Sequence, residues 1–310
     1  MNKNNLLFFK RTPNVEIDLV RIQSCLDIVE RPTWDEFAKT ISPIWLKVLQ
    51  GPGTSIKQVF DADVKEVKNL YENFFVNGLS DGAAIGSKMY ELRSYLKILY
   101  REKRRFDILN DIASKQNVNF NYNLSDFGQP WTMKLGGQFV NFELTDHFYF
   151  ADIAVKLLKS FNINDVIFLG DGCGYLAQAL LSFDNEGLVK NVTMIDLYHF
   201  LIRQFILLDG CKEGVSIAYL NGERSDYPKT NSEKVLINQD SLPEINKEGQ
   251  EKYFRYMKQN NVKIFISYNK VDRSKGHEEF RTVADVFFEN KLLCMESAMR
   301  PGYWIEVWLV

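Results

Sequence analysis

Hydrophobic side chains recur at helical spacing through the first third of the chain. Between residues 16 and 118 they return every three or four positions, as at Leu19, Ile22 and Leu26. This spacing places them on one face of a helix. Turn residues such as Pro32 divide the region into about five helices. The pattern predicts an N-terminal helical domain with few strands.

The composition changes near residue 119, and we take this change as a domain boundary. Residues 119–131 (NFNYNLSDFGQPW) are rich in asparagine, aromatic and turn residues. We therefore expect a helical domain over residues 1–124 and a second domain over residues 125–310. At the start of the second domain, residues 134–142 predict a short hairpin that turns at two glycines. A helix over residues 145–161 follows.

Beyond this helix the hydrophobic pattern changes to short apolar runs. Most of them are separated by stretches long enough for a helix, and this alternation predicts a parallel sheet covered on both faces. The last two runs, Leu292–Ala298 and Tyr303–Val310, are joined by only four residues and can pair only as antiparallel strands. The expected fold is a doubly wound, Rossmann-like α/β domain with an antiparallel C-terminal hairpin. The five earlier runs are residues 166–169, 192–195, 216–220, 234–237 and 262–266.

Composition and charge narrow the classes of partner. The chain is 45% hydrophobic and 25% charged, as expected for a globular protein, and 38 basic against 40 acidic residues give a net charge of −2. This balance argues against nucleic acid and favours a small-molecule or glycan substrate. The basic run 101–105 is expected to be a solvated helix face. Four widely spaced cysteines, no secretory signal and no stretch of about 20 apolar residues predict a soluble, cytoplasmic protein without a membrane span.

A glycine-rich turn follows the first predicted parallel strand. Gly170, Gly172 and Gly174 stand between this strand and the next helix, and glycine permits tight turns and close approach of the backbone to a ligand. The dinucleotide pattern G-x-G-x-x-G would need a glycine at 175, where Tyr175 stands. The G-x-G-x-G spacing therefore favours S-adenosylmethionine over NAD. A glycine-rich turn that binds no ligand is the alternative.

Asp196 ends the second parallel strand, 22 residues after Gly174. A carboxylate at this point can accept two hydrogen bonds from a ribose diol. The alternative is that Asp196 caps the helix that begins near Leu197. The order of strand, glycine loop, helix, strand and acid favours cofactor binding. The expected cofactor contacts are Gly170, Asp171, Gly172, Gly174, Asp196 and Leu197.

Three segments of the chain resemble the sugar O-methyltransferases of bacterial polysaccharide and natural-product clusters. LGDGCGYLA is similar to the family's I-G-x-G-x-G-x-L-A segment, and MIDLYHFLIRQFILL is similar to its I-D-L-P-x-x-x-x-x-Q-x-x-x-L segment. LINQDSLPEI and the later IFISYN resemble its N-T-x-S-x-x-E-M and S-Y-N segments. The resemblance covers about residues 125–310. It implies a class I, S-adenosylmethionine-dependent methyltransferase that acts on a sugar or glycan hydroxyl in polysaccharide biosynthesis.

Two positions depart from the family's pattern. The family usually has an acidic residue two positions before the first glycine, where this chain has Phe168, and Tyr198 replaces the family's proline. The resemblance implies that Phe168 removes a carboxylate that commonly supports the methionine moiety. Asp171 could compensate for this loss, but an exposed turn aspartate is the favoured interpretation of that residue. Phe168 therefore leaves two alternatives to full activity: weaker cofactor binding, or a Rossmann-like interaction module without catalysis.

Methyl transfer to a hydroxyl needs alignment and a proton acceptor or a metal. His277 is the preferred base because imidazole titrates near neutral pH; the alternative is a surface histidine that caps a helix. Asp240 is the second catalytic candidate. With Asp272 it could hold a divalent metal, but two scattered carboxylates are weak evidence and a metal is not favoured. His199 could face the cofactor, but solvent exposure or helix packing is favoured, and His147 is expected to pack among neighbouring phenylalanines.

The acceptor should bind at the carboxyl ends of the parallel strands, where open α/β sheets bind their ligands. An NAD-dependent oxidoreductase is the competing enzyme class, against which the glycine spacing and the C-terminal hairpin both count. The candidate substrate-binding residues follow the fourth and fifth strands and are Gln239, Ser241, Tyr268 and Asn269.

Overall fold

The computed structural model shows two compact units, Met1–Tyr149 and Phe150–Val310. The division falls inside helix α8 (Leu144–Phe161), and the predicted domain boundary after residue 124 stays a prediction. The structure describes residues 9–40, 46, 49–50, 54–79, 92–116, 127–135, 138–141, 144–222, 231–270, 277–288 and 290–310.

The first unit contains the predicted helices. Asp63 begins one of them with a capping box: its side chain accepts from the N–H of Glu66, and the Glu66 side chain accepts from the N–H of Asp63. Ile22, Cys25 and Val67 are among the residues buried in this unit. Among the described residues the helices are α1 (Leu19–Ile28), α2 (Trp34–Thr40), α4 (Ile56–Val59), α5 (Val64–Glu72) and α7 (Leu92–Gln116).

The first unit also holds a small antiparallel sheet, while the helical region predicted over residues 16–118 contains no strand among its described residues. The predicted hairpin is confirmed as β2 (Trp131–Leu135) and β3 (Gln138–Asn141), and β1 (Phe9–Arg11) pairs with β2 to complete a three-stranded antiparallel sheet. The Thr132 hydroxyl donates to the Lys10 carbonyl, 122 residues earlier. A strand of three residues is too short to show an alternating hydrophobic pattern, so its pairing with a strand more than 100 residues away could not be predicted from the local sequence.

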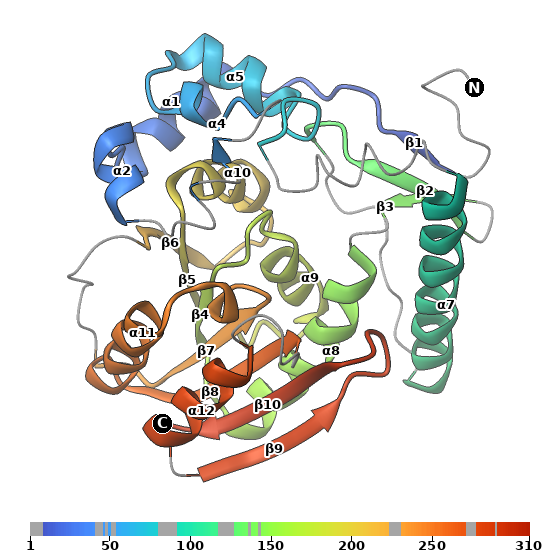
Figure 1. Ribbon diagram of the computed structural model, residues 1–310, viewed down its shortest axis with the longest axis vertical. Coiled ribbons are helices and arrows are strands. Elements are labelled where there is room, and N and C mark those ends of the chain that lie inside the picture. Colours follow the sequence, from blue (N-terminus) through green and yellow to red (C-terminus); the bar gives the residue numbers. More distant parts are fainter. Residues whose placement is uncertain are drawn as a thin grey trace. The chain divides into compact units, whose positions relative to one another are not determined.

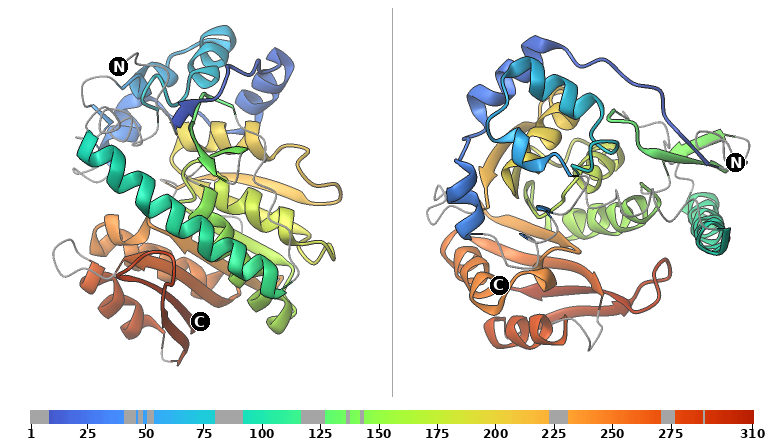
Figure 2. Two further views of the ribbon diagram at one scale, coloured as in Figure 1. Left: turned by 90° about the vertical axis from the view of Figure 1, so that its right-hand side faces the viewer. Right: turned by 45° about the horizontal axis from the view of Figure 1, so that its top comes forward.

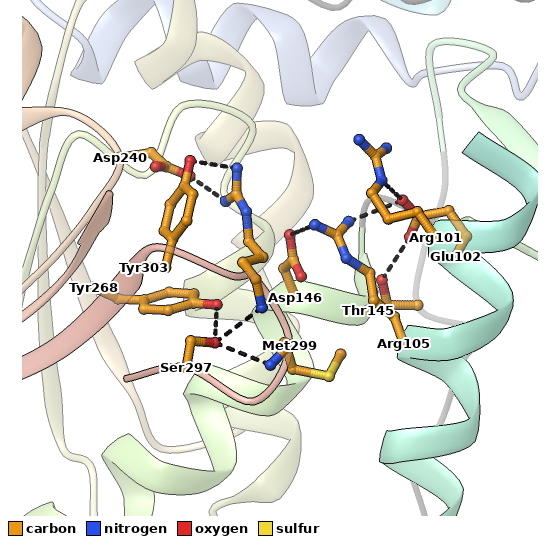
Figure 3. Close-up of polar contacts among 11 residues, drawn as sticks. Arg101, Glu102, Arg105, Thr145, Asp146, Asp240, Tyr268, Ser297, Met299 and Tyr303 are labelled. Carbon is orange, nitrogen blue, oxygen red and sulfur yellow. Dashed lines mark hydrogen bonds and ion pairs between the residues drawn. The ribbon is translucent and has the colours of Figure 1, made fainter. Parts of the chain in front are cut away.

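The basic run on α7, the long teal helix in the left view of Figure 2, is only partly a solvated face. Arg105 is buried and forms ion pairs with Glu102 (2.9 Å) and Asp146 (3.1 Å), while the half-exposed Arg101 also contacts Glu102 (2.5 Å; Figure 3). The Thr145 hydroxyl donates to the other oxygen of Glu102. The cluster joins α7 to the first turn of α8, so Arg105 is a packing residue rather than a solvated one.

The second unit is built on a seven-stranded sheet in the order β6-β5-β4-β7-β8-β10-β9. The first five strands in this order are parallel, and β10 runs antiparallel to both of its neighbours. All residues of β4 and β7 are buried, and each strand has an apolar run at its centre, as expected for parallel strands covered on both faces. The strands are β4 (Asp165–Leu169), β5 (Asn191–Asp196), β6 (Ser216–Asn221), β7 (Lys234–Gln239), β8 (Val262–Lys270), β9 (Asn290–Glu296) and β10 (Tyr303–Leu309).

Helices cover both faces of this sheet (Figure 1). On one face, Phe254 of α11 (Lys247–Gln259) and Phe280 of α12 (His277–Phe287) pack with Phe265 of β8 in an apolar core. On the other face, the Phe150 ring of α8 lies 4.9 Å from the ring of Tyr268. Helices α9 (Tyr175–Phe183) and α10 (Tyr198–Leu208) follow β4 and β5, and the short helix η1 (Leu242–Glu244) follows β7.

The strand order identifies the type of α/β fold. The dinucleotide-binding order is 3-2-1-4-5-6, whereas here the last strand enters antiparallel between the fifth and sixth strands. The sheet is therefore Rossmann-like without the dinucleotide-binding strand order, and the prediction of a doubly wound sheet with an antiparallel hairpin is confirmed. In the part of the chain that the structure describes, no helix has the length and apolar content needed to cross a membrane.

Candidate active site

The glycine loop connects β4 to α9, and its three glycines all have positive φ angles: 68° at Gly170, 58° at Gly172 and 81° at Gly174. A Cβ on Gly170 would lie 2.1 Å from the Ser241 hydroxyl oxygen, and one on Gly174 would lie 3.1 Å from Cγ of Gln204. A Cβ on Gly172 would meet no described atom within 4 Å. Packing within the protein explains the first and third glycines, and Gly172 has the open side that a ligand can approach.

Asp171, inside the loop, caps helix α9. Its two carboxylate oxygens accept from the backbone N–H groups of Leu176 (3.0 Å) and Ala177 (2.8 Å), in the first turn of the helix. Burial raises the pKa of Asp171 to about 8, the nearby charge of Asp196 adds to this rise, and the two N–H donors oppose it. Asp171 thus occupies the helix end where an anionic ligand group could bind. Its contact with a cofactor stays a prediction.

The Asp196 carboxylate lies directly against the glycine loop. Its Oδ2 accepts from the N–H of Gly172 (2.7 Å) and from Nε2 of Gln204 (2.7 Å), and its Oδ1 accepts from the N–H of Leu197 (2.8 Å). Burial raises the pKa of Asp196 to about 6, and these hydrogen bonds oppose the rise. Leu197 is the N-cap residue of α10, and no side chain caps that helix. Asp196 therefore connects the second strand to the loop and does not act as a helix cap.

Gln204 is a site residue that the sequence analysis missed. It is fully buried on α10, and its Nε2 also donates to the Gly172 carbonyl (2.9 Å). The sequence contains two signals: Gln204 falls on the glutamine of the resembled family's I-D-L-P-x-x-x-x-x-Q-x-x-x-L segment, and Arg203 and Gln204 interrupt the apolar run 200–208. Neither signal specifies the direction of the side chain.

Phe168, where the resembled family has an acidic residue, belongs to the core of the sheet. It is 1% exposed and lies in register with Met194 of β5 and Ile237 of β7. Tyr198, where the family has a proline, is the first residue of α10 and is also buried. Of the two acids near the loop, Asp171 is engaged with α9, and Asp196 is the carboxylate that contacts the Gly172 backbone.

A network of buried amide side chains contacts the backbone at the start of the glycine loop. Asn238 of β7 donates to the Leu169 carbonyl (2.8 Å) and to the Ser241 hydroxyl, which also donates to Leu169 (3.1 Å). Asn269 of β8 donates to Oδ1 of Asn238 (2.9 Å). Ser241 and Asn269 thus belong to the support of the loop, and the buried Gln239 lies beside them at the end of β7. Substrate binding by Gln239, Ser241 and Asn269 stays a prediction.

Asp240 forms an ion pair at the carboxyl edge of the sheet (Figure 3). It has a positive φ of 61°, and its Oδ2 accepts from the Arg300 guanidinium at 2.5 Å. Arg300 also donates to the Tyr303 hydroxyl (2.5 Å), and its guanidinium carbon lies 3.6 Å from the centre of that ring. Arg300 is in the turn between β9 and β10, so the ion pair joins this turn to the loop after β7.

Tyr268, a predicted substrate-binding residue, is fully buried beneath the same turn. Its hydroxyl lies 2.7 Å from the Ser297 hydroxyl, which also accepts from the N–H groups of Met299 and Arg300 (Figure 3). The Tyr268 ring lies 5.5 Å from the Tyr303 ring. Tyr268 therefore supports the turn that carries Arg300, and its contact with a substrate stays a prediction.

The structure places the histidines unequally. His277 begins α12, but its side chain lies outside the described part of the structure, as does all of Asp272. His199 is fully buried with its ring 4.2 Å from that of Phe200, and burial lowers its pKa to about 3. It is therefore a neutral packing residue. Among the described residues no group of three or more His, Cys, Asp or Glu side chains could hold a metal ion.

No family model and no curated protein matches the chain. Among solved structures, the chain is similar to the methyltransferase domain of bacterial CtHen1-CN, with 16% identity, a TM-score of 0.41 and coverage of 54% of this chain and 100% of that chain. It is also similar to the CurJ carbon methyltransferase, with 11% identity, a TM-score of 0.42 and coverage of 54% of this chain and 55% of that chain. The mitomycin 7-O-methyltransferase MmcR is similar with 15% identity, a TM-score of 0.41 and coverage of 55% of each chain. The chain thus spans little more than half of the last two chains. Likeness at this level carries no functional argument.

Proposed function

We propose that the chain is an S-adenosylmethionine-dependent methyltransferase whose acceptor is a hydroxyl oxygen of a sugar or glycan. The observation that carries the proposal is the junction of Gly172 and Asp196. The N–H of Gly172 donates to Asp196, and the side of Gly172 that a Cβ would occupy faces no described atom within 4 Å. This junction lies at the carboxyl ends of β4 and β5, where open α/β sheets bind nucleosides.

The residues present fit the proposed cofactor. Gly172 offers the open backbone position for close approach, and the Oδ1 atom of Asp196 offers an acceptor for a ribose hydroxyl. The half-exposed Leu197 follows directly and supplies apolar surface beside that acceptor. The buried Phe168 supplies no charge for the amino acid end of the cofactor, so we expect the nucleoside end to provide most of the affinity.

The bound cofactor would supply a methyl group on a sulfonium, which is transferred by in-line displacement. The protein then has to orient the acceptor, exclude water and accept the hydroxyl proton. The Asp240–Arg300 pair and Tyr303 provide hydrogen-bonding groups at the acceptor end of the sheet, beyond the glycine loop. We propose His277 as the proton acceptor, because a neutral imidazole can take a proton near pH 7.

The sugar assignment rests on the resemblance of the glycine loop, the segment after Asp196 and the strand-end segments to sugar O-methyltransferases. The polar acceptor edge supports it, because side chains such as Asp240 and Arg300 can form hydrogen bonds with a polyol. An acceptor without hydroxyl groups would leave these polar side chains without substrate partners.

The proposal is tested by release of S-adenosylhomocysteine from S-adenosylmethionine in the presence of a panel of nucleotide sugars, deoxysugars and oligosaccharides. We expect turnover with at least one hydroxyl acceptor and none with its O-methylated product. Cofactor binding without turnover on any acceptor would favour the non-catalytic module. Binding of NAD without S-adenosylhomocysteine would favour the oxidoreductase.

A further inference from the structure

We infer that Gln204 is a positioning residue for cofactor recognition, and this inference rests on the proposed function. Gln204 fixes the Asp196 carboxylate and the Gly172 peptide in one arrangement, so that Oδ1 of Asp196 faces the ligand. Gln204 itself does not touch the cofactor. Its role is exerted through the two groups that we expect to do so.

The hydrogen bonds of a single amide carry this inference. Nε2 of Gln204 donates to Oδ2 of Asp196 at 2.7 Å and to the carbonyl of Gly172 at 2.9 Å. The N–H of Gly172 donates to the same Oδ2 at 2.7 Å. Both polar groups of Gly172 are therefore tied to the Gln204–Asp196 pair, and the orientation of the loop at its open position is coupled to that of the carboxylate.

The hydrogen bonds already made by the Asp196 carboxylate determine which of its two oxygens can accept a hydrogen bond from a ligand. A carboxylate offers about four acceptor sites, two on each oxygen. Gln204 and Gly172 together use both sites of Oδ2, and Leu197 uses one site of Oδ1. The remaining site is on Oδ1. In this arrangement a ribose diol meets one acceptor on Asp196 and not two.

Gln204 is confined by its surroundings, so the amide has little freedom to choose another partner. It is fully buried, and a Cβ on Gly174 would lie 3.1 Å from its Cγ and 3.5 Å from its Cα. The absence of a side chain at Gly174 therefore lets α10 approach the loop closely enough for the amide to reach Gly172. The third glycine of the loop serves this contact.

Gln204 also influences the charge of Asp196. Its Nε2 stabilises the carboxylate, whereas burial raises the pKa of Asp196 to about 6. The charge of Asp196 adds to the rise of the Asp171 pKa, and His199 stays neutral in this range because burial lowers its pKa to about 3. Arg203 donates to a buried tyrosine hydroxyl on α9, and Tyr253 donates to the Gly222 carbonyl. Among the described residues, the titratable or charged groups on the elements around Asp196 include Asp171 and Cys173 in the loop, Tyr175 on α9, Tyr198, His199 and Arg203 on α10, Tyr219 on β6 and Tyr253 on α11.

The test is the pH dependence of S-adenosylhomocysteine affinity, measured by isothermal titration between pH 5 and 9. In the wild type we expect affinity to fall as the pH drops through about 6, because ligand hydroxyls donate to the charged form of Asp196. Gln204→Met keeps the length of the side chain and removes the donor. It should weaken binding about tenfold at pH 7.5 and move the midpoint of the pH profile up by about one unit.

Gln204→Glu provides a second variant of nearly equal size, whose carboxyl would face Asp196. It should move the midpoint further in the same direction, because a nearby negative charge disfavours ionisation. Gln250→Met is the matched control. Gln250 is a buried glutamine on α11 whose Nε2 also donates to two acceptors, the carbonyls of Leu242 and Ile245. Its loss should lower the melting temperature and leave the pH midpoint unchanged.

The outcomes separate this inference from the proposed function. A wild type that does not bind S-adenosylhomocysteine overturns the proposed function and the inference together. A wild type that binds, with Gln204→Met equal to it in affinity and midpoint, overturns the inference alone. Weaker binding by the same factor at every pH would assign Gln204 a structural role and would also overturn the inference. If Gln204→Met does not fold, Gln204→Glu is judged by the same criteria.

Discussion

Replacing Asp196 with alanine tests the cofactor site at its charged residue. The change removes all three hydrogen bonds to the carboxylate and the remaining acceptor site on Oδ1. It also removes a buried group whose pKa is raised to about 6. We therefore expect the ligand-free protein to remain folded, because removing a poorly solvated charge offsets part of the lost hydrogen bonding.

The expected loss of affinity follows from the count of acceptor sites. One charge-assisted hydrogen bond to a ribose hydroxyl is worth about 1.5–3 kcal/mol, which corresponds to about a tenfold to hundredfold increase in Kd for S-adenosylhomocysteine. Asp196→Asn keeps an oxygen acceptor without the charge. A neutral hydrogen bond is about half as strong as one to a charged group, so Asp196→Asn should keep part of the binding energy and lose less affinity than Asp196→Ala.

Isothermal titration of both variants at pH 7.5 measures these losses. Asp184→Asn is the control. Asp184 is a buried aspartate outside the site that accepts from the N–H groups of Leu188 and Val189 and from Lys212. It should alter stability without changing affinity. If Asp196→Ala lowers the melting temperature of the ligand-free protein but keeps the wild-type affinity, Asp196 is a structural residue and the assigned cofactor contact is wrong.

Two further substitutions test the open backbone position and the proposed base. Gly172→Ala places a methyl group where no described atom lies within 4 Å, and it should weaken S-adenosylhomocysteine binding. Gly210→Ala is the control, because Gly210 has a similar φ of 70° and equally open surroundings. Both variants should carry a backbone strain of about 1–2 kcal/mol, but Gly210→Ala should keep the wild-type affinity. Equal affinities for these two variants would place the ligand elsewhere. His277→Ala should lower kcat about 10²–10⁴-fold with little change in cofactor affinity, and the rise of kcat with pH near 6.5 should disappear. A nearly silent His277→Ala combined with loss of activity in EDTA and recovery in Mg²⁺ would assign the proton acceptor's role to a metal site.

The centre of the sheet in the second unit could be predicted because its strands are buried on both faces. The runs at 166–169 and 234–237 are mainly apolar, and the observed strands β4 and β7 differ from them by one or two residues at an end. The short connection before Tyr303 permitted only an antiparallel pairing, which the structure confirms, with residues 297–302 joining β9 to β10. Local pattern was sufficient here because burial and connection length determine these features.

Features that depend on distant partners could not be predicted in the same way. β1 is three residues long and obtains its stability from pairing with β2. Arg105 looks like a solvated residue until Asp146 is placed beside it. In each case the energy comes from a partner that a local window does not contain.

The candidate site shows the same division. The sequence identifies the glycines and Asp196 by spacing, but it does not distinguish Gly172, with its open side, from Gly170, which packs against Ser241. It also leaves the direction of Gln204 undetermined. Only the positions of the neighbouring atoms in the structure distinguish a glycine needed for packing from one that faces open space.

A nucleoside site for S-adenosylmethionine at Gly172 and Asp196 can be tested by isothermal titration of the wild-type protein with S-adenosylhomocysteine and, separately, with NAD. We expect saturable binding of S-adenosylhomocysteine at one site per chain and none of NAD, with Asp196→Ala weakening the former by about tenfold to a hundredfold. Binding of NAD alone, or S-adenosylhomocysteine affinity that is indifferent to Asp196, would contradict this expectation.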